Sequence, residues 1–161
     1  MTDHNIIGVI APTVSRAGHV FLENLIRILA ETHKEVYLIT GSSVSIEGSN
    51  IQVFSLKHQK SCNIMQIFSY SLFELDITRT MASLSENTHT WIFFMGGECM
   101  LIPMLIAKLF KKKTIICLAG SIEKQFMVER NKLYLPLILM KKVNLILVSN
   151  IVVYSDNLLH E

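Results

Sequence analysis

The stretch Trp91–Ser121, WIFFMGGECMLIPMLIAKLFKKKTIICLAGS, contains one complete unit of the strand–helix–strand alternation that runs through this chain. Its first apolar run, Trp91–Met95, stops at two glycines, and its second, Thr114–Ala119, stops at Gly120-Ser121. Both favour a buried strand that ends in a turn. Between them, Glu98–Lys111 has the length and apolar content of a helix. A strand, a helix and a strand in this order predict two parallel strands joined by a crossover.

The same alternation continues on both sides of this stretch. The other expected strands are Asn5–Ala11, Glu35–Thr40, Ile51–Leu56 and Ile151–Tyr154, and the other expected helices run from about Arg16 to His33, Cys62 to Glu86 and Ile122 to Val148. The strands are almost continuously apolar, which is typical of burial on both faces. We therefore predict an α/β fold, a doubly wound (Rossmann-like) three-layer domain with a mainly parallel sheet of about six strands.

Two helices show apolar residues at helical spacing. The stripe expected in the first helix is Phe21, Leu25, Ile28 and Leu29, and the residues that mark the second helix are Ile64, Phe68, Leu72 and Leu75. Spacings of three and four residues place such side chains on one side of a helix.

Composition limits the classes of protein to consider. The chain has 161 residues, of which 50% are hydrophobic and 17% charged, with a net charge of +2. This length fits one domain, and the charge is too small for a nucleic-acid partner. The longest apolar runs stop at Lys108 and Lys141, too short for a transmembrane span. The three cysteines, Cys62, Cys99 and Cys117, form no disulfide framework, which favours the reducing cytoplasm.

Several well-defined sites are excluded by their missing motifs. The chain has no GxGxxG, no GxxxxGK[ST] and no GxSxG, so a dinucleotide fingerprint, a P-loop and a hydrolase nucleophile elbow are absent. His58 and Cys62 have the spacing of metal ligands, but no second pair completes four ligands, so we predict no metal site.

The predicted sheet indicates where a ligand would bind. Parallel strands end at one edge, and ligands of such sheets bind at that edge. The candidate residues follow three strands: Ser15, Arg16 and Gly18 after the first, Gly96, Gly97 and Glu98 after the fourth, and Gly120 and Ser121 after the fifth. Helix N-termini there offer free N–H groups to an anion. The alternative is structural: Ser121 caps a helix, and Glu98 complements a helix dipole.

Two basic stretches, Lys108–Lys113 and Lys141-Lys142, end or interrupt apolar helices. They are either solvated helix ends or part of a surface that is attracted to anionic lipid.

These segments, in this order, resemble the N-terminal domain of GT-B glycosyltransferases of the family 4 type. Ala11–Gly18 and ENLIRILAETHKEVYLIT (23–40) are similar to the family's glycine loop, first helix and second strand. Residues 91–121 are similar to its fourth strand, helix and fifth strand, and SNIVVYSDNLL (149–159) to its closing strand. The resemblance covers essentially the whole chain. Where the family often has two adjacent glycines in the first loop, this chain has Ala17-Gly18.

The resemblance implies an enzyme that transfers a sugar from a nucleotide-sugar donor to a glycan or lipid-linked acceptor, with no tightly bound cofactor. This half would supply the acceptor side of the cleft. Arg16 and Gly18 would lie near the acceptor or the phosphates, Glu98 would contact acceptor hydroxyls as the candidate catalytic residue, and Gly120-Ser121 would lie at the sugar.

The family's C-terminal nucleotide-sugar domain is absent from these 161 residues, so the expected partner is that domain and the chain alone is expected to be inactive. Two alternatives stay open: a natural half-enzyme completed by a separate C-terminal subunit, and a non-enzymatic Rossmann-like binding or interaction module. A cytoplasmic location, with peripheral membrane contact, fits each of them.

Overall fold

The computed structural model describes residues 6–12, 14, 16–56, 64–118 and 134–153. Six strands form one sheet: β1 (Ile6–Ala11), β2 (Glu35–Thr40), β3 (Ile51–Ser55), β4 (Thr90–Phe94), β5 (Lys113–Leu118) and β6 (Asn150–Val153). The described helices are α1 (Arg16–Thr32), α2 (Ile64–Leu84), α3 (Leu101–Leu109) and α5 (Tyr134–Leu147), together with a short 3-10 turn, η1 (Gly97–Cys99).

The order of strands in the sheet is β3-β2-β1-β4-β5-β6, and every neighbouring pair is parallel. This confirms the predicted doubly wound, Rossmann-like fold with six strands. Along the sequence, β2 and β3 are added on one side of β1. The chain then crosses to the other side of β1, where β4 begins. The gap between the ends of β1 and β4 is therefore the switch point of the sheet, where ligands of such folds bind.

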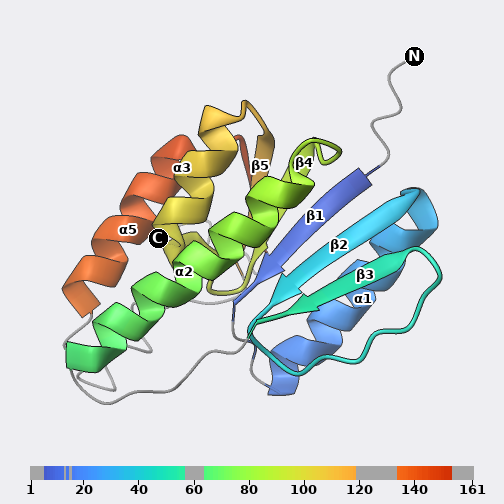
Figure 1. The fold of residues 1–161 in the computed structure, drawn as a ribbon, viewed down its shortest axis with the longest axis horizontal. Coiled ribbons are helices and arrows are strands. Elements are labelled where there is room, and N and C mark those ends of the chain that lie inside the picture. Colours follow the sequence, from blue (N-terminus) through green and yellow to red (C-terminus); the bar gives the residue numbers. More distant parts are fainter. Residues whose placement is uncertain (1–5, 13, 15, 57–63, 119–133, 154–161) are drawn as a thin grey trace.

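The sheet is covered on both faces (Figure 1). Leu22, Ile26 and Leu29 of α1 pack on one face. The other face is covered by α2, α3 and α5, which contribute Phe73, Met104 and Leu145 among others to a second cluster. Successive strand residues point to opposite faces. In β1, β2 and β4 both faces are buried, which explains why these strands are almost continuously apolar, whereas the residues of the edge strands β3 and β6 are exposed or only partly buried.

The expected core stripe of α1 is displaced by one residue. Phe21 and Ile28 are 52% and 59% exposed, while Leu22 and Ile26 are fully buried and Leu29 is buried as predicted. Both sets of residues have helical spacing, because α1 carries apolar side chains around most of its circumference. Periodicity alone does not decide which set faces the sheet.

The apolar residues that marked α2 in the sequence do lie in a helix, but three of them face solvent. Phe68 and Leu72 are 61% and 47% exposed, and Leu75 is also exposed. Phe73, Ile77 and Met81 pack on the sheet, and Glu74 is buried beside them. The reason is the same as in α1: α2 has apolar residues on two sides, and the polar Glu74 interrupts the stripe that is buried.

The remaining boundaries agree with the sequence analysis to within a few residues, apart from two segments. The helix expected over Glu98–Lys111 is divided into η1 and α3, because Met100 between them has an extended backbone. The long helix expected from Ile122 is described only from Tyr134, and its proposed cap, Ser121, lies outside the described residues. Within the described part of the chain, every helix is too short or too polar to cross a membrane.

Candidate functional site

Three turns meet at the carboxyl edge of the sheet, next to the switch point. The Gly41 N–H, after β2, donates to the Pro12 carbonyl, after β1, at 2.7 Å, and the Val14 N–H donates to Ser42 Oγ at 3.0 Å. After β4, Gly96 lies so close that an added Cβ would be 3.5 Å from Pro12 Cγ. The turns that follow β1, β2 and β4 therefore form one continuous surface.

The turn after β4 has a left-handed backbone. Met95 has a φ of 21° and Gly96 a φ of 91°, and the Gly96 N–H donates to Glu98 Oε2 at 2.6 Å. Gly97 packs closely behind them, since an added Cβ would lie 3.0 Å from Phe93 Cβ. The two glycines are needed here because the chain both reverses its direction and passes tightly over the sheet.

Glu98 is buried beneath this turn and is only 3% exposed. Burial raises the pKa of its carboxyl, while hydrogen bonds from the Glu98 and Gly96 N–H groups and the charge of Lys141 act in the opposite direction. From the far side, Asn144 Nδ2 on α5 donates to the Glu98 carbonyl at 2.9 Å. The Glu98 carboxylate thus stabilises the turn that carries it.

A second buried carboxylate, which the sequence analysis missed, lies beside it. Glu74 on α2 is 1% exposed, and its two oxygens accept hydrogen bonds from the N–H groups of Leu101 and Ile102 at 3.3 and 3.4 Å. Burial raises the pKa of Glu74 to about 7. The signal in the sequence was an acidic residue three positions before Ile77 and seven before Met81, which places it on the same side of α2 as these two buried residues.

Two further titratable groups share this buried region. Tyr70, one helical turn before Glu74, hydrogen-bonds to the Glu74 carboxylate, and burial raises the pKa of its hydroxyl well above 10. Burial and the neighbouring Glu98 raise the pKa of the Cys99 thiol to about 12. Cys99 is therefore a protonated, buried thiol and not a nucleophile at neutral pH.

Helices α1 and α3 both begin at this edge of the sheet, but they differ as sites for an anion. The N-terminus of α3 is already occupied by the Glu74 carboxylate. The first turn of α1, which begins at Arg16, contains no acidic residue. A phosphate group is attracted by the free N–H groups and the dipole of a helix start, so α1 is the better candidate.

The structure describes some of the predicted site residues and leaves others undescribed. Gly96, Gly97 and Glu98 lie in the turn after β4, and Gly18 is buried in the first turn of α1, which starts at Arg16. Ser15, Gly120 and Ser121 lie outside the described residues. The described residues contain no group of three or more His, Cys, Asp or Glu side chains that could hold a metal ion.

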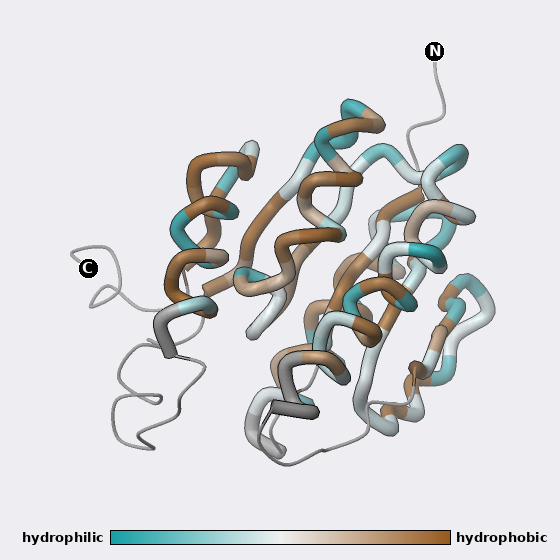
Figure 2. Tube along the Cα trace, turned by 60° about the vertical axis from the view of Figure 1, so that its left-hand side comes forward, coloured by the Kyte–Doolittle hydropathy of each residue, from teal (hydrophilic) through white to brown (hydrophobic). Residues whose placement is uncertain are grey.

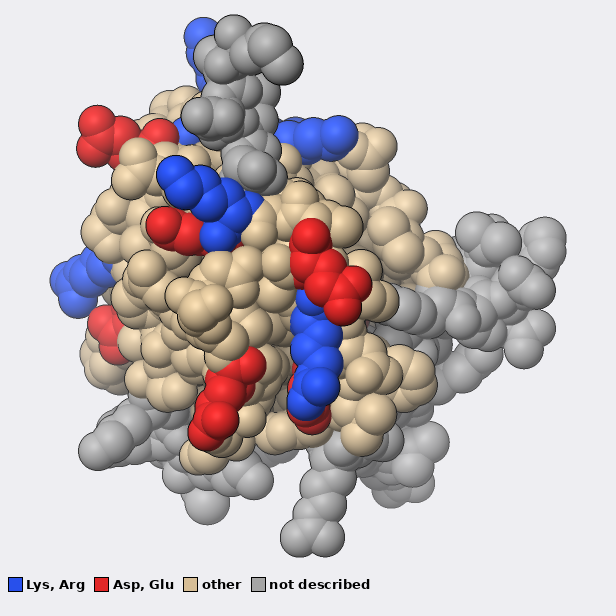
Figure 3. All heavy atoms as spheres, turned by 90° about the vertical axis from the view of Figure 1, so that its right-hand side faces the viewer, with Lys and Arg blue, Asp and Glu red and all other residues tan. Residues whose placement is uncertain are grey.

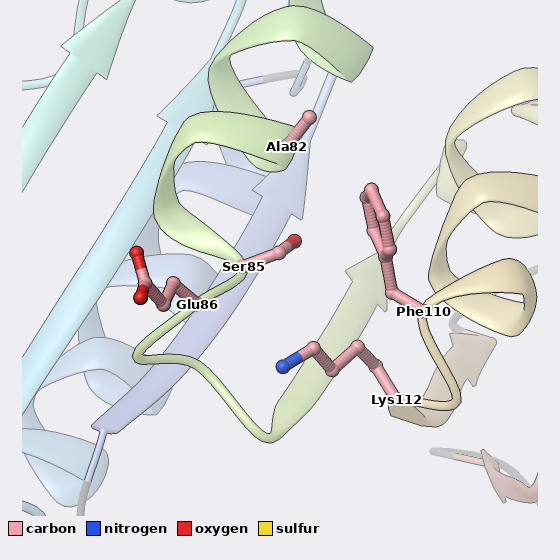
Figure 4. A pocket seen from close by; sticks show the side chains of 5 residues that line it. All are labelled: Ala82, Ser85, Glu86, Phe110 and Lys112. Carbon is pink, nitrogen blue, oxygen red and sulfur yellow. The ribbon is translucent and has the colours of Figure 1, made fainter.

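A cavity of about 280 Å³ lies at the opposite edge of the sheet and does not belong to this site. It is lined by Ala82, Ser85, Glu86, Phe110 and Lys112, between the ends of α2 and α3 (Figure 4). These residues precede β4 and β5, whereas the candidate site follows the strands.

Comparison with known proteins gives a fold and no family. Neither a family model nor a curated protein matches the sequence. Among solved structures, Phytolacca americana UGT2, complexed with UDP-2fluoro-glucose and pterostilbene, matches with a TM-score of 0.65 at 12% identity, over 91% of this chain and 47% of that chain. LpCGTa in complex with UDP matches with a TM-score of 0.65 at 11% identity, over 93% of this chain and 45% of that chain.

A putative UDP-N-acetylglucosamine 2-epimerase from Listeria monocytogenes also matches, with a TM-score of 0.56 at 13% identity over 94% of this chain and 39% of that chain. The fold resembles one Rossmann-like half of a GT-B glycosyltransferase. The chain spans about half the length, or less, of these relatives. At such low identity the likeness shows the fold alone.

Proposed function

We propose that this chain is the N-terminal, acceptor-side half of a GT-B glycosyltransferase of the family 4 type, acting in the cytoplasm. The supporting observation is that the turns after β1, β2 and β4 form one surface at the switch point of a sheet that resembles half of such enzymes. The reaction is transfer of a sugar from a nucleotide-sugar to a glycan or lipid-linked acceptor.

We assign the candidate residues to two roles, contact with the acceptor or the donor phosphates and contact with the transferred sugar. Ser15, Arg16 and Gly18 are the proposed contacts of the acceptor or the donor phosphates. The N–H groups at the start of α1 and the positive charge of Arg16 would stabilise the charge that develops on the leaving phosphate. Gly96 and Gly97 allow a ligand to approach the backbone closely. Gly120-Ser121 contacts the transferred sugar.

Glu98 is the proposed contact for acceptor hydroxyls. Its Oε2 is hydrogen-bonded to Gly96, so an acceptor hydroxyl would bind to the other carboxylate oxygen. Because Glu98 also stabilises the turn, its substitution is expected to affect both folding and activity, and both have to be measured.

The second half of the active site is a nucleotide-sugar-binding domain, on the same polypeptide or on a separate subunit. Sequencing the gene beyond codon 161 and purifying the chain from its natural host identify this component. We expect UDP- or GDP-sugar turnover by the combined protein and none by the 161 residues alone. Turnover by the isolated chain contradicts the proposal. A combined protein without transfer and without acceptor binding favours the non-enzymatic module.

The variant Glu98→Gln tests the site within that combined protein. We expect kcat/KM to fall at least about ten-fold, because a carboxylate that accepts a hydroxyl proton or hydrogen bond is replaced by a weaker acceptor. The matched control is Glu47→Gln, an exposed acid in the loop between β2 and β3. An unchanged kcat/KM for Glu98→Gln in a folded protein removes Glu98 from the site.

A further inference from the structure

Charge is distributed unevenly over the fold. Residues 99–118 contain four lysines and residues 134–153 contain two, and neither segment contains an Asp or Glu. These segments form α3, β5, α5 and β6. On the side of the molecule formed by β2, β3 and α1, acidic and basic side chains are interspersed (Figure 3), and Glu23 pairs with Arg27 at 2.7 Å.

The same lysine-rich part of the fold exposes large apolar side chains. Leu105 and Leu109 of α3 are 47% and 73% exposed, and Leu139 and Ile146 of α5 are 65% and 84% exposed. The spacing of four residues in α3 and seven in α5 places each pair on one side of its helix. Exposed Lys111 follows α3, and exposed Lys142 lies between the two apolar residues of α5.

We name the outward side of these two helices the α3–α5 face. Its exposed residues are Leu105, Leu109, Leu139 and Ile146, with Lys111 and Lys142. Helices α3 and α5 pack against each other and lie over the same face of the sheet. Their inner sides are occupied by buried Met104 and Ala107 of α3 and Asn144 of α5, so the exposed rows point outward. Figure 2 shows the apolar turns of this helical layer.

We propose that the α3–α5 face binds the surface of an anionic lipid bilayer. Apolar side chains enter the boundary between headgroups and acyl chains, and lysines at their margin bind lipid phosphates. The charge favours lipid over a second copy of the chain, because a symmetric dimer through this face would bring lysines against lysines.

Helices α3 and α5 run from the carboxyl edge of the sheet to the opposite edge, so one end of the α3–α5 face lies near the candidate site. A lipid-linked acceptor held at the bilayer surface would then be close to the turn that carries Glu98. This placement depends on the proposed function, but the lipid contact does not, because it is measured without donor or acceptor.

Sedimentation of the 161-residue chain with lipid vesicles tests the inference. We expect binding to vesicles of phosphatidylcholine with roughly a third phosphatidylglycerol, little binding to pure phosphatidylcholine, and loss of binding at about 1 M salt, where the Debye length is about 3 Å. Replacing Leu109 and Ile146 by Ser should weaken binding at least about ten-fold. Lys142→Glu should weaken it about five-fold or more.

The matched control is Ile28→Ser on α1, a residue of similar exposure (59%) on the opposite face of the sheet. It should leave vesicle binding unchanged, and circular dichroism confirms that each variant is folded. Equal vesicle binding by the control and the α3–α5 variants overturns the inference. Equal binding of the wild-type chain to anionic and to pure phosphatidylcholine vesicles also overturns it. Failure to bind vesicles, together with a dimer that Leu109→Ser dissociates, assigns the face to a protein partner.

Discussion

The backbone N–H of Leu101 donates a hydrogen bond to the carboxylate of Glu74, at 3.3 Å, across a separation of 27 residues. Leu101 is the first residue of α3, and the residue before it, Met100, offers no side-chain cap. The helix is capped instead by a buried acid of α2. This contact joins the helical layer to the turn that follows β4, so we expect Glu74 to affect both stability and the geometry of the candidate site.

Stability should fall as the pH rises from about 4.5 to about 7, because the pKa of Glu74 is raised to about 7. In this range the folded protein binds a proton that the unfolded chain has released, so the free energy of unfolding decreases with pH. The full difference is about 3 kcal/mol for Glu74. Glu98, whose pKa is also raised, acts in the same direction. Urea unfolding at about pH 5 and about pH 8 measures the effect.

The variant Glu74→Gln isolates the contribution of Glu74 to this pH dependence, because the amide oxygen still accepts a hydrogen bond and the amide does not titrate in this range. The variant should lose less stability between the two pH values than the wild-type protein. An identical pH dependence in both proteins would show that Glu74 titrates normally.

The left-handed backbone at Gly96 should make this position sensitive to any side chain. With a φ of 91° and only an ordinary van der Waals contact for an added Cβ, 3.5 Å from Pro12 Cγ, Gly96→Ala is opposed by backbone strain rather than by a clash. We expect a loss of about 1–2 kcal/mol, and a smaller loss for Gly96→Asn, because Asn adopts left-handed conformations more readily. Chemical denaturation of both variants tests the order, and a greater loss for Asn than for Ala contradicts it.

Gly8 of β1 lies opposite Trp91 of β4, and a Cβ there would be 2.3 Å from the indole ring. Gly8→Ala should therefore destabilise the protein by about 3 kcal/mol or more. In a Trp91→Leu background the same change should cost at least about 1 kcal/mol less, because the smaller side chain leaves room. Equal costs in the two backgrounds would mean that the ring is not the obstacle.

Asn144 should contribute to stability through its hydrogen bond to the Glu98 carbonyl, at 2.9 Å. Asn144→Ala leaves this buried carbonyl without its side-chain donor and should cost about 1–3 kcal/mol. Asn24→Ala, an exposed change on α1, is the control and should stay within about 0.5 kcal/mol of the wild-type protein. Equal effects of the two changes would argue against a role for the Asn144 contact.

The sheet was predictable because its signals are local. Each strand is a short apolar run that ends at a glycine, proline or polar residue, and the helices between them are long enough for parallel crossovers. The turn Gly96-Gly97 was identified for the same reason, since two adjacent glycines after a buried strand indicate an unusual backbone.

The inward faces of the helices were not predictable. In α2, the exposed Phe68 and Leu72 have the same spacing as the buried Phe73 and Ile77, and the sheet decides between them. Glu74 was missed because its role depends on a helix that starts 27 residues later. Contacts between distant segments carry no signal in a single sequence unless a residue type is out of place, as an acid on a buried helix face is.

The central position of β1 has a consequence for synthesis. Ile7 pairs with Thr90, 83 residues later, while β2 covers the other side of β1 much earlier. A ribosome adding roughly 5–20 residues per second needs several seconds to make that interval. During this time the side of β1 that pairs with β4 has no strand to bind, so it stays open to water until the second half of the sheet has been made.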